Sequence, residues 1–170
     1  MQAVKKLLVA ALLALALAPG YVLGHGNEKG TATARLEEGV VTIEYMRPTL
    51  KGRDVLSLIQ PGSYWRLGAD MPTTLTTDVA LTMGKNNVPA GEYTLVLRFH
   101  GDNKWSVMVA EGAARGTWEP QGLVAEVPMM VSELGSSVEA LTIKLESEQS
   151  RGKLIIEWGT TQMVADFAAA

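Results

Sequence analysis

Apolar and polar side chains alternate with a period of two residues in segment after segment of this chain. In residues 93–99 the apolar Tyr93, Leu95, Leu97 and Phe99 alternate with Thr94, Val96 and Arg98. Successive side chains of a strand point to opposite faces, so this period predicts half-buried β-strands. The alternation recurs in residues 41–45, 74–82, 141–146 and 154–158, and no long helical pattern follows residue 24. We therefore expect an all-β, single-domain antiparallel β-sandwich, or a barrel-like relative, of about eight or nine strands.

Turn-forming residues separate these segments. The stretch "LEEGV" predicts a hairpin after residues 31–36, and "GKNNVPAGE" and "HGDNK" predict the turns on either side of residues 93–99. The stretch "GTWEPQG" is predicted to be a loop, and Pro128 suits an edge strand or a bulge. The side chains predicted to point inward are those of Leu95, Leu97, Ile143, Leu145, Ile156 and Trp158.

The first residues predict where the protein works. Lys5 and Lys6 precede an uncharged apolar run, Leu7–Ala18, as in a secretory signal peptide. The run is shorter than the roughly 20 residues that span a bilayer, so we expect cleavage rather than a retained transmembrane segment. Small residues place the cleavage after Gly24, which leaves a domain of residues 25–170 with a loose N-terminal tail. We expect an exported protein, in the periplasm or the medium, and the absence of cysteine excludes disulfides.

Charge is unevenly distributed along the mature chain. Without Lys5 and Lys6 it has 13 basic against 18 acidic residues, a net charge of −5. An acidic exported chain is a poor candidate for nucleic-acid binding. Residues 47–66 are the exception, because four cations against Asp54 give this segment a charge of +3 and the rest of the mature chain −8.

The common catalytic signatures are missing from the sequence. It contains no G-x-S-x-G elbow, no phosphate-binding G-x-x-x-x-G-K loop and no H-E-x-x-H motif. Two histidines and no cysteine cannot supply the usual zinc sites or a Cys–His nucleophile pair. A carboxylate-dependent hydrolase stays open as an alternative, since two acids can meet across a sheet. We expect a non-catalytic binding or envelope-associated module rather than an enzyme.

Three linked motifs resemble those of a known family. They are "VTIEYMRPTLKGRDV", "PGSYWRLGADMPTTLT" and "VPAGEYTLVL", followed by a tryptophan. In order and spacing they resemble a bacterial exported family known as domain of unknown function 2911. The matching positions are Tyr45, Arg47, Pro48, Lys51, Gly52, Arg53, Gly62, Trp65, Arg66, Gly68, Ala69, Ala90, Gly91, Tyr93 and Trp105. Asp70 stands where the family commonly has asparagine, and the resemblance implies an exported β-rich domain without implying an activity.

Two hypotheses follow for the segment of positive charge. In the first, its residues form a ligand site for a small anionic, carbohydrate-like or other ring-bearing molecule, because arginines chelate carboxylates or phosphates and a tryptophan face stacks on rings. The candidate residues are Arg47, Lys51, Arg53, Trp65, Arg66 and Asp70. In the second, Trp65 caps the core and Arg66 pairs with a carboxylate such as Asp70. We favour the structural interpretation for Arg66 and expect Lys51 and Arg53 to be free to bind.

Copper is a further alternative. Cleavage after Gly24 makes His25 the first residue, with an amine and an imidazole that together can chelate copper(II). The second ligand would be His100, the other histidine of the chain. The competing interpretation of His25 is an ordinary exposed tail, for which no cofactor is required.

Overall fold

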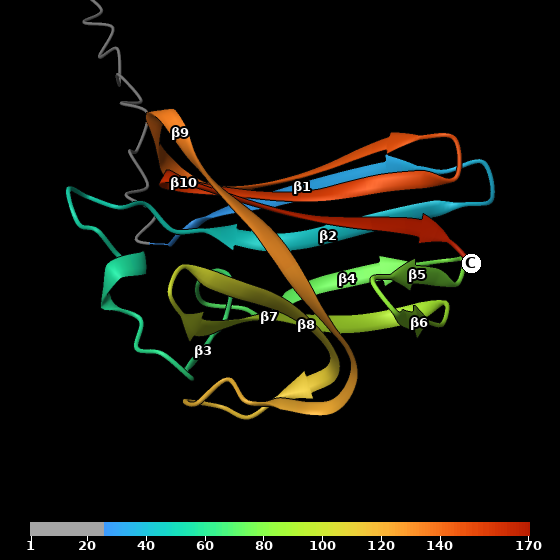
Figure 1. Ribbon diagram of the computed structural model, residues 1–170, viewed down its shortest axis with the longest axis horizontal. Coiled ribbons are helices and arrows are strands. Elements are labelled where there is room, and N and C mark those ends of the chain that lie inside the picture. The colour runs from blue at the N-terminus through green and yellow to red at the C-terminus, as the bar shows by residue number, and fades with distance from the viewer. Residues whose placement is uncertain (1–25) are drawn as a thin grey trace, which may run out of the picture.

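The computed structural model describes residues 26–170, which form ten strands and one short 3-10 helix (Figure 1). The elements are β1 (Glu28–Arg35), β2 (Val40–Arg47), η1 (Leu56–Leu58), β3 (Tyr64–Trp65), β4 (Thr73–Thr77), β5 (Leu81–Met83), β6 (Asn86–Val88), β7 (Gly91–Gly101), β8 (Lys104–Ala113), β9 (Pro120–Glu148) and β10 (Arg151–Ala169). All strand pairs are antiparallel, which confirms the predicted fold class. No helix in this part of the chain has the length and apolar character needed to cross a bilayer.

One continuous sheet makes up both layers of the sandwich. Its strand order is β1-β2-β4-β7-β8-β9-β10-β5-β6, with β3 added on β7, and its two ends do not meet. Strand β9 connects the layers: residues 120–129 pair with β8, and residues 130–148 pair with β10. In Figure 1, β9 runs diagonally across the molecule from β8 to the opposite layer. The sheet therefore folds over on itself along this one strand.

Strand β10 doubles back at Gly159. This glycine has a φ of +60°, a conformation that residues with a Cβ rarely adopt, and the register with β9 shifts on both sides of it. We call residues 151–157 the first limb of β10 and residues 161–169 its second limb. The amide of Ala169 donates to the carbonyl of Ser150 at 2.8 Å, which holds the ends of the two limbs together.

The core lies between the two layers, where the alternation placed it. Leu95, Leu97, Ile143, Ile156 and Trp158 are buried, and Leu145 is partly buried and packs against them. The prediction of the inward face is thus confirmed. The centre of β7 and β8 is buried on its other face as well, through Val96 and Met108. These two strands are therefore covered on both sides, which simple alternation did not reveal.

Two features of the hydrogen bonding between strands, at Pro128 and at Tyr45, fit this packing. Pro128 pairs with Ser106 of β8, and the pairing of β9 with β10 begins only at Met130, so β9 has a strand on one side alone at this proline, as predicted. The buried hydroxyl of Tyr45 in β2 accepts a hydrogen bond from the amide of Ile143 at 2.8 Å and donates to the carbonyl of the same residue at 3.3 Å. This hydroxyl ties β2 to β9.

An ion pair between the half-exposed Lys144 and the buried Glu157 lies at the bend of β10. Lys144 donates to Glu157 at 2.7 Å, and the side-chain amide of Gln162 donates to the other carboxylate oxygen at 2.8 Å. Burial alone would raise the pKa of Glu157, but the hydrogen bond from Lys144 outweighs it and holds this pKa below its ordinary value of 4.5. The pair joins β9 to the first limb of β10, and Gln162 adds the second limb.

The pair has a consequence for stability at acid pH. Because the pKa of Glu157 is lower in the folded state, the unfolded chain binds the proton more tightly. The stabilisation is present above pH 4.5 and is lost as the pH falls through the folded-state pKa. In urea unfolding between pH 7 and pH 3, Glu157→Gln and Lys144→Met should each show a shallower acid loss than the parent. An unchanged slope in both variants would contradict this role.

Candidate functional site

The six residues proposed from the sequence each have their own partners in the structure. Arg47, at the end of β2, is held on three sides: its Nε donates to the carbonyl of Leu141 at 3.2 Å, and its other nitrogens reach Glu28 at 3.1 Å and Thr142 at 3.4 Å. These contacts join β1, β2 and β9. Arg47 therefore helps to hold these three strands of the sandwich together.

Lys51 and Arg53 lie in the loop after β2. The backbone amide of Lys51 donates to a carboxylate oxygen of Glu139 at 2.8 Å, while its side chain is exposed. Arg53 is also exposed, and its Nε donates to the carbonyl of Leu50 at 3.0 Å. Within residues 26–170 neither side chain forms an ion pair. Both cations are thus open to solvent.

Trp65 points into the sandwich. Its ring stacks on that of Trp158, with the centroids 5.2 Å apart and the planes 12° from parallel. The indole N–H of Trp158 donates to the carbonyl of Glu139 at 3.2 Å. One face of Trp65 is therefore occupied by the core, as the core-capping interpretation of this residue had it.

Arg66 and Asp70 are not paired. Between them, Leu67 and Gly68 have positive φ values of +49° and +150°, and the chain turns so that the two side chains find different partners. A carboxylate oxygen of Asp70 accepts from the side-chain amide of Asn27 at 2.9 Å. The guanidinium of Arg66 instead lies over the ring of Trp118, 5.4 Å from its centroid. The expected Arg66–Asp70 ion pair is thus corrected: Arg66 has an aromatic partner and no carboxylate partner in the described part of the chain.

A second arginine, missed in the sequence, lies on the same side of the sheet. Arg98 of β7 is paired across the sheet with Tyr64 of β3, and its guanidinium lies 5.4 Å from the centroid of that ring. The Nε of Arg98 is buried and has no hydrogen-bond partner in the described structure. Arg98 also forms no ion pair with any residue in the range 26–170. We call Tyr64, Arg66, Arg98 and Trp118 the guanidinium face.

The chemistry of the guanidinium face follows from how each cation is held. Stacking on a ring uses the flat face of a guanidinium and leaves the N–H donors in its plane free. Those donors match the two oxygens of a carboxylate or a phosphate. A buried donor without a partner is costly, and the Nε of Arg98 is covered by protein atoms, so a ligand would bind through the outer N–H groups of this guanidinium. The guanidinium face thus presents the kind of donors that oxyanion sites use.

His100 lies two residues beyond Arg98 on the same face of β7. Its Nε2 is 3.0 Å from the hydroxyl of Ser106 and 3.3 Å from a carboxylate oxygen of Glu126. A Ser–His–acid relay needs the serine and the acid on different ring nitrogens, and here both contact the same one. These residues line a groove of about 510 Å³ at the end of the β7–β8 hairpin. The geometry does not fit nucleophilic catalysis.

Two hypotheses from the sequence remain, a copper site and a carboxylate-dependent hydrolase. Residues 26–170 contain no group of three or more histidine and acidic side chains arranged to hold a metal ion, and His25 lies outside the described residues, so the copper hypothesis stays a prediction. For a carboxylate-dependent hydrolase, a general acid needs a raised pKa. The buried carboxylate of Glu157 has a lowered pKa instead, caused mainly by Lys144, and gives this alternative no support.

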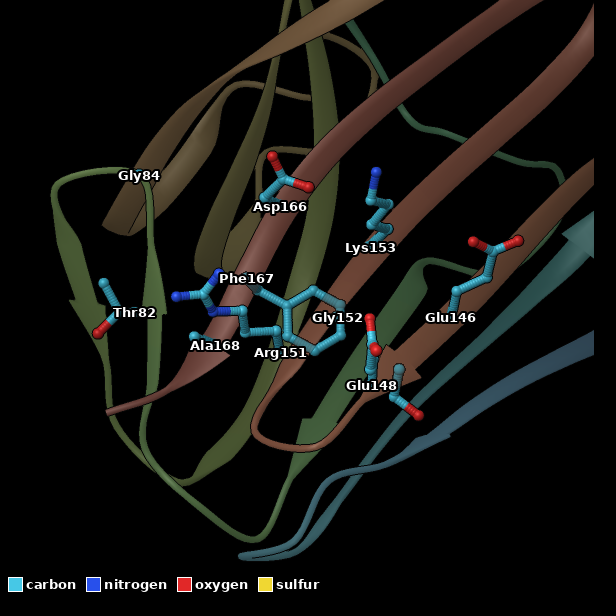
Figure 2. Close-up of a pocket in the computed structure, with 11 residues that line it drawn as sticks. Thr82, Gly84, Glu146, Glu148, Arg151, Gly152, Lys153, Asp166, Phe167 and Ala168 are labelled. Atoms are coloured by element: carbon cyan, nitrogen blue, oxygen red, sulfur yellow. The ribbon is translucent and has the colours of Figure 1, made fainter.

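A larger hollow lies on another part of the molecule, at the open ends of the two limbs of β10 (Figure 2). It has a volume of about 730 Å³ and is lined by residues of β5, β9 and both limbs. The buried ring of Phe167 lies so close to Gly152 that any side chain at position 152 would collide with it. None of the residues proposed from the sequence lines this hollow.

The comparisons with known proteins identify a family whose function is unknown. A family model described as "Protein of unknown function (DUF2911)" matches residues 27–167. No curated protein and no solved structure matches the chain. The match covers nearly all of the sandwich, from the residue before β1 to the second limb of β10. The chain therefore belongs to the DUF2911 family of proteins of unknown function.

Proposed function

We propose that this protein is an exported, non-catalytic binding module that holds a small anionic ligand on the guanidinium face. The observation that carries the proposal is the state of Arg98, a half-buried guanidinium with a buried Nε that has no partner and no carboxylate within ion-pair distance in the described residues. Natural proteins pair nearly all such buried donors, so an unpaired one requires an explanation. An oxyanion bound to the outer N–H groups of the same guanidinium would offset this cost.

The second cation strengthens the proposal. Arg66 follows β3 directly, and Tyr64 of β3 is the cross-strand partner of Arg98, so the two guanidiniums start from neighbouring positions on the sheet. Each is held by an aromatic ring, which orders the long side chain before a ligand arrives. Two ordered guanidiniums favour a ligand that carries a carboxylate or a phosphate, such as an acidic sugar. Export rests on the N-terminal signal pattern, which lies outside the described residues.

Titration calorimetry with inorganic phosphate and with glucuronate tests the site. Arg98→Met and Arg66→Met should each weaken binding of the better probe about tenfold or more, because each removes charge-assisted hydrogen bonds. Arg35→Met, which removes an exposed cation at the end of β1, is the matched control and should change the affinity less than about twofold. Binding should also weaken as salt is added.

Stability separates a ligand-binding arginine from a structural one. Arg98→Met removes a buried donor that has no partner, so the variant should unfold at the same urea concentration as the parent or at a higher one. A clear loss of stability in Arg98→Met, together with unchanged affinity for both probes, would refute the proposal. Equal loss of affinity in Arg35→Met would show that the anion senses only overall charge.

A further inference from the structure

The groove at the end of the β7–β8 hairpin lies next to the position of Arg98. Arg98 pairs directly with Ser106 of β8, and Ser106 pairs in turn with Pro128 of β9, so these three side chains point to one face of the sheet. Leu97 and Val107, the adjacent residues of β7 and β8, are buried in the core, so this face is the outer one. Ser106 also lines the groove, which therefore adjoins the guanidinium face.

Three polar side chains of the groove contact one another on this outer face. The Nε2 of His100 lies 3.0 Å from the hydroxyl of Ser106 and 3.3 Å from a carboxylate oxygen of Glu126. We call these three residues the polar cluster. The side chains of His100 and Glu126 are 33% and 35% exposed, so both remain accessible from the groove. A carboxylate has acceptor sites for about four donors, so Glu126 can accept further hydrogen bonds from a ligand.

The polar cluster and the guanidinium face favour different chemical groups. The arginines attract an acidic group, whereas the carboxylate of Glu126 repels one. An ammonium only donates hydrogen bonds, so it would leave the donors of the polar cluster without an acceptor. A hydroxyl group suits the cluster better, because it can donate to Glu126 and accept from His100 or Ser106 at the same time. A ligand that extends over both surfaces is therefore acidic at one end and hydroxylated at the other.

The distance between the two surfaces limits the size of this ligand. The Cβ atoms of Arg98 and Ser106, which are directly opposite, are about 5 Å apart. The guanidinium of Arg98 lies over Tyr64 of β3, on the other side of β7, which adds about one strand spacing of 5 Å. After a hydrogen bond of about 2.8 Å at each end, roughly 4–5 Å remains for the ligand. A single six-membered ring with its substituents spans this gap, and the groove of about 510 Å³ has room for it.

We propose that the ligand of the guanidinium face is a polyhydroxy acid the size of one sugar ring, and that the polar cluster selects it over simple anions. Its acid group pairs with Arg66 and Arg98. Its hydroxyl groups donate to Glu126 and accept from His100. This inference rests on the proposed anion site, which supplies the affinity for the acid group, and it adds the residues that determine specificity.

Two acids of equal ring size test the specificity by titration calorimetry. Glucuronate carries hydroxyl groups and cyclohexanecarboxylate carries none, so the parent protein should bind glucuronate at least about tenfold more tightly. Equal affinity for the two acids would overturn the hydroxyl specificity and would leave the anion site in place. No saturable binding of either acid would overturn both proposals.

Two variants test whether the polar cluster is responsible. Glu126→Met and His100→Leu keep much of the side-chain volume but remove the hydrogen-bonding groups, so each should weaken glucuronate binding about tenfold. The affinity for cyclohexanecarboxylate should change less than about twofold in His100→Leu. It should not fall in Glu126→Met, because this variant loses a negative charge near the bound acid. Retained binding of cyclohexanecarboxylate also shows that both variants are folded.

Glu92→Met is the matched control for the loss of a carboxylate. Glu92 is exposed near the opposite end of β7, so the affinity for glucuronate should stay within about twofold of the parent value. Unaltered glucuronate affinity in both Glu126→Met and His100→Leu, with a loss in Arg98→Met, would overturn the role of the polar cluster and retain the anion site. Equal losses in Glu92→Met and Glu126→Met would overturn it as well.

Discussion

Replacing Leu97 with alanine is expected to lower the free energy of unfolding by about 2–5 kcal/mol. The side chain is fully buried in the central strand β7, where its neighbours come from both layers of the sandwich. Removing it leaves a cavity in addition to the lost burial, and a strand paired on both sides has little freedom to collapse into that cavity. Urea unfolding at neutral pH, analysed by its midpoint and slope, measures the loss.

Leu58→Ala is the matched control for this experiment. Leu58 lies in the short helix η1 and keeps 68% of its surface exposed, so the same chemical change should cost less than about 0.5 kcal/mol. Thr76→Ala, on the solvent face of β4, should behave in the same way. Similar losses at Leu97 and Leu58 would mean that the inward face of β7 is misassigned.

Tyr45→Phe is expected to have the second large effect, about 2–4 kcal/mol of lost stability. The substitution removes one oxygen and leaves two backbone groups of Ile143 without their partner, the amide as a donor and the carbonyl as an acceptor. Each unsatisfied buried group costs about 1–3 kcal/mol. The ring itself stays in place, so the loss is attributable to the hydroxyl and not to a cavity.

Tyr93→Phe provides a graded comparison. The hydroxyl of Tyr93 donates only to the carbonyl of Pro89, at 2.9 Å and within the same turn, so its removal should cost about 0.5–1.5 kcal/mol. The two variants differ in whether the hydroxyl joins separate strands or acts locally. Equal unfolding midpoints for Tyr45→Phe and Tyr93→Phe would argue against the role of the Tyr45 hydroxyl in joining β2 to β9.

Much of the fold could be predicted from the sequence, because alternation reports which residues face the core. That signal placed Leu97 and Ile143 inside, and the turn residues of "LEEGV" marked the β1–β2 hairpin. The alternation missed strand β6. Asn86–Val88 pairs with β5, inside a stretch that was predicted to be a turn. The alternation also broke β9 into pieces, since the mostly exposed residues 132–139 carry no two-residue pattern although they belong to one strand. Strands that pair with each other are far apart in the chain, and local periodicity carries no information about which strands pair.

The candidate site was harder to predict for the same reason. Arg66 stood out in the sequence through its charge and its neighbour Trp65, but its actual partner, Trp118, is more than 50 residues away. Arg98 looked like an ordinary solvent-facing residue of an alternating strand, and only the addition of Tyr64 on β7 shows what covers it. The sequence has a net positive charge in residues 47–66, but Arg47 spends hydrogen-bond donors on contacts with β1 and β9. Charge along a chain does not report which charges share a surface.

The pairing of the second limb of β10 with β5 sets an order of events during folding. Residues 167–169 form the ladder with residues 81–83, and the amide of Ala170 donates to the carbonyl of Ala80 at 2.9 Å. Strands β5 and β6 therefore have no other strand in their ladder until some 80 residues of later chain have been synthesised, and an isolated two-stranded hairpin is marginally stable. A chain emerging in one direction cannot complete its sheet early, and pairings between distant segments form slowly. Folding of this sandwich is thus a late, cooperative event, in which the last strand completes a layer that was begun in the first half of the sequence.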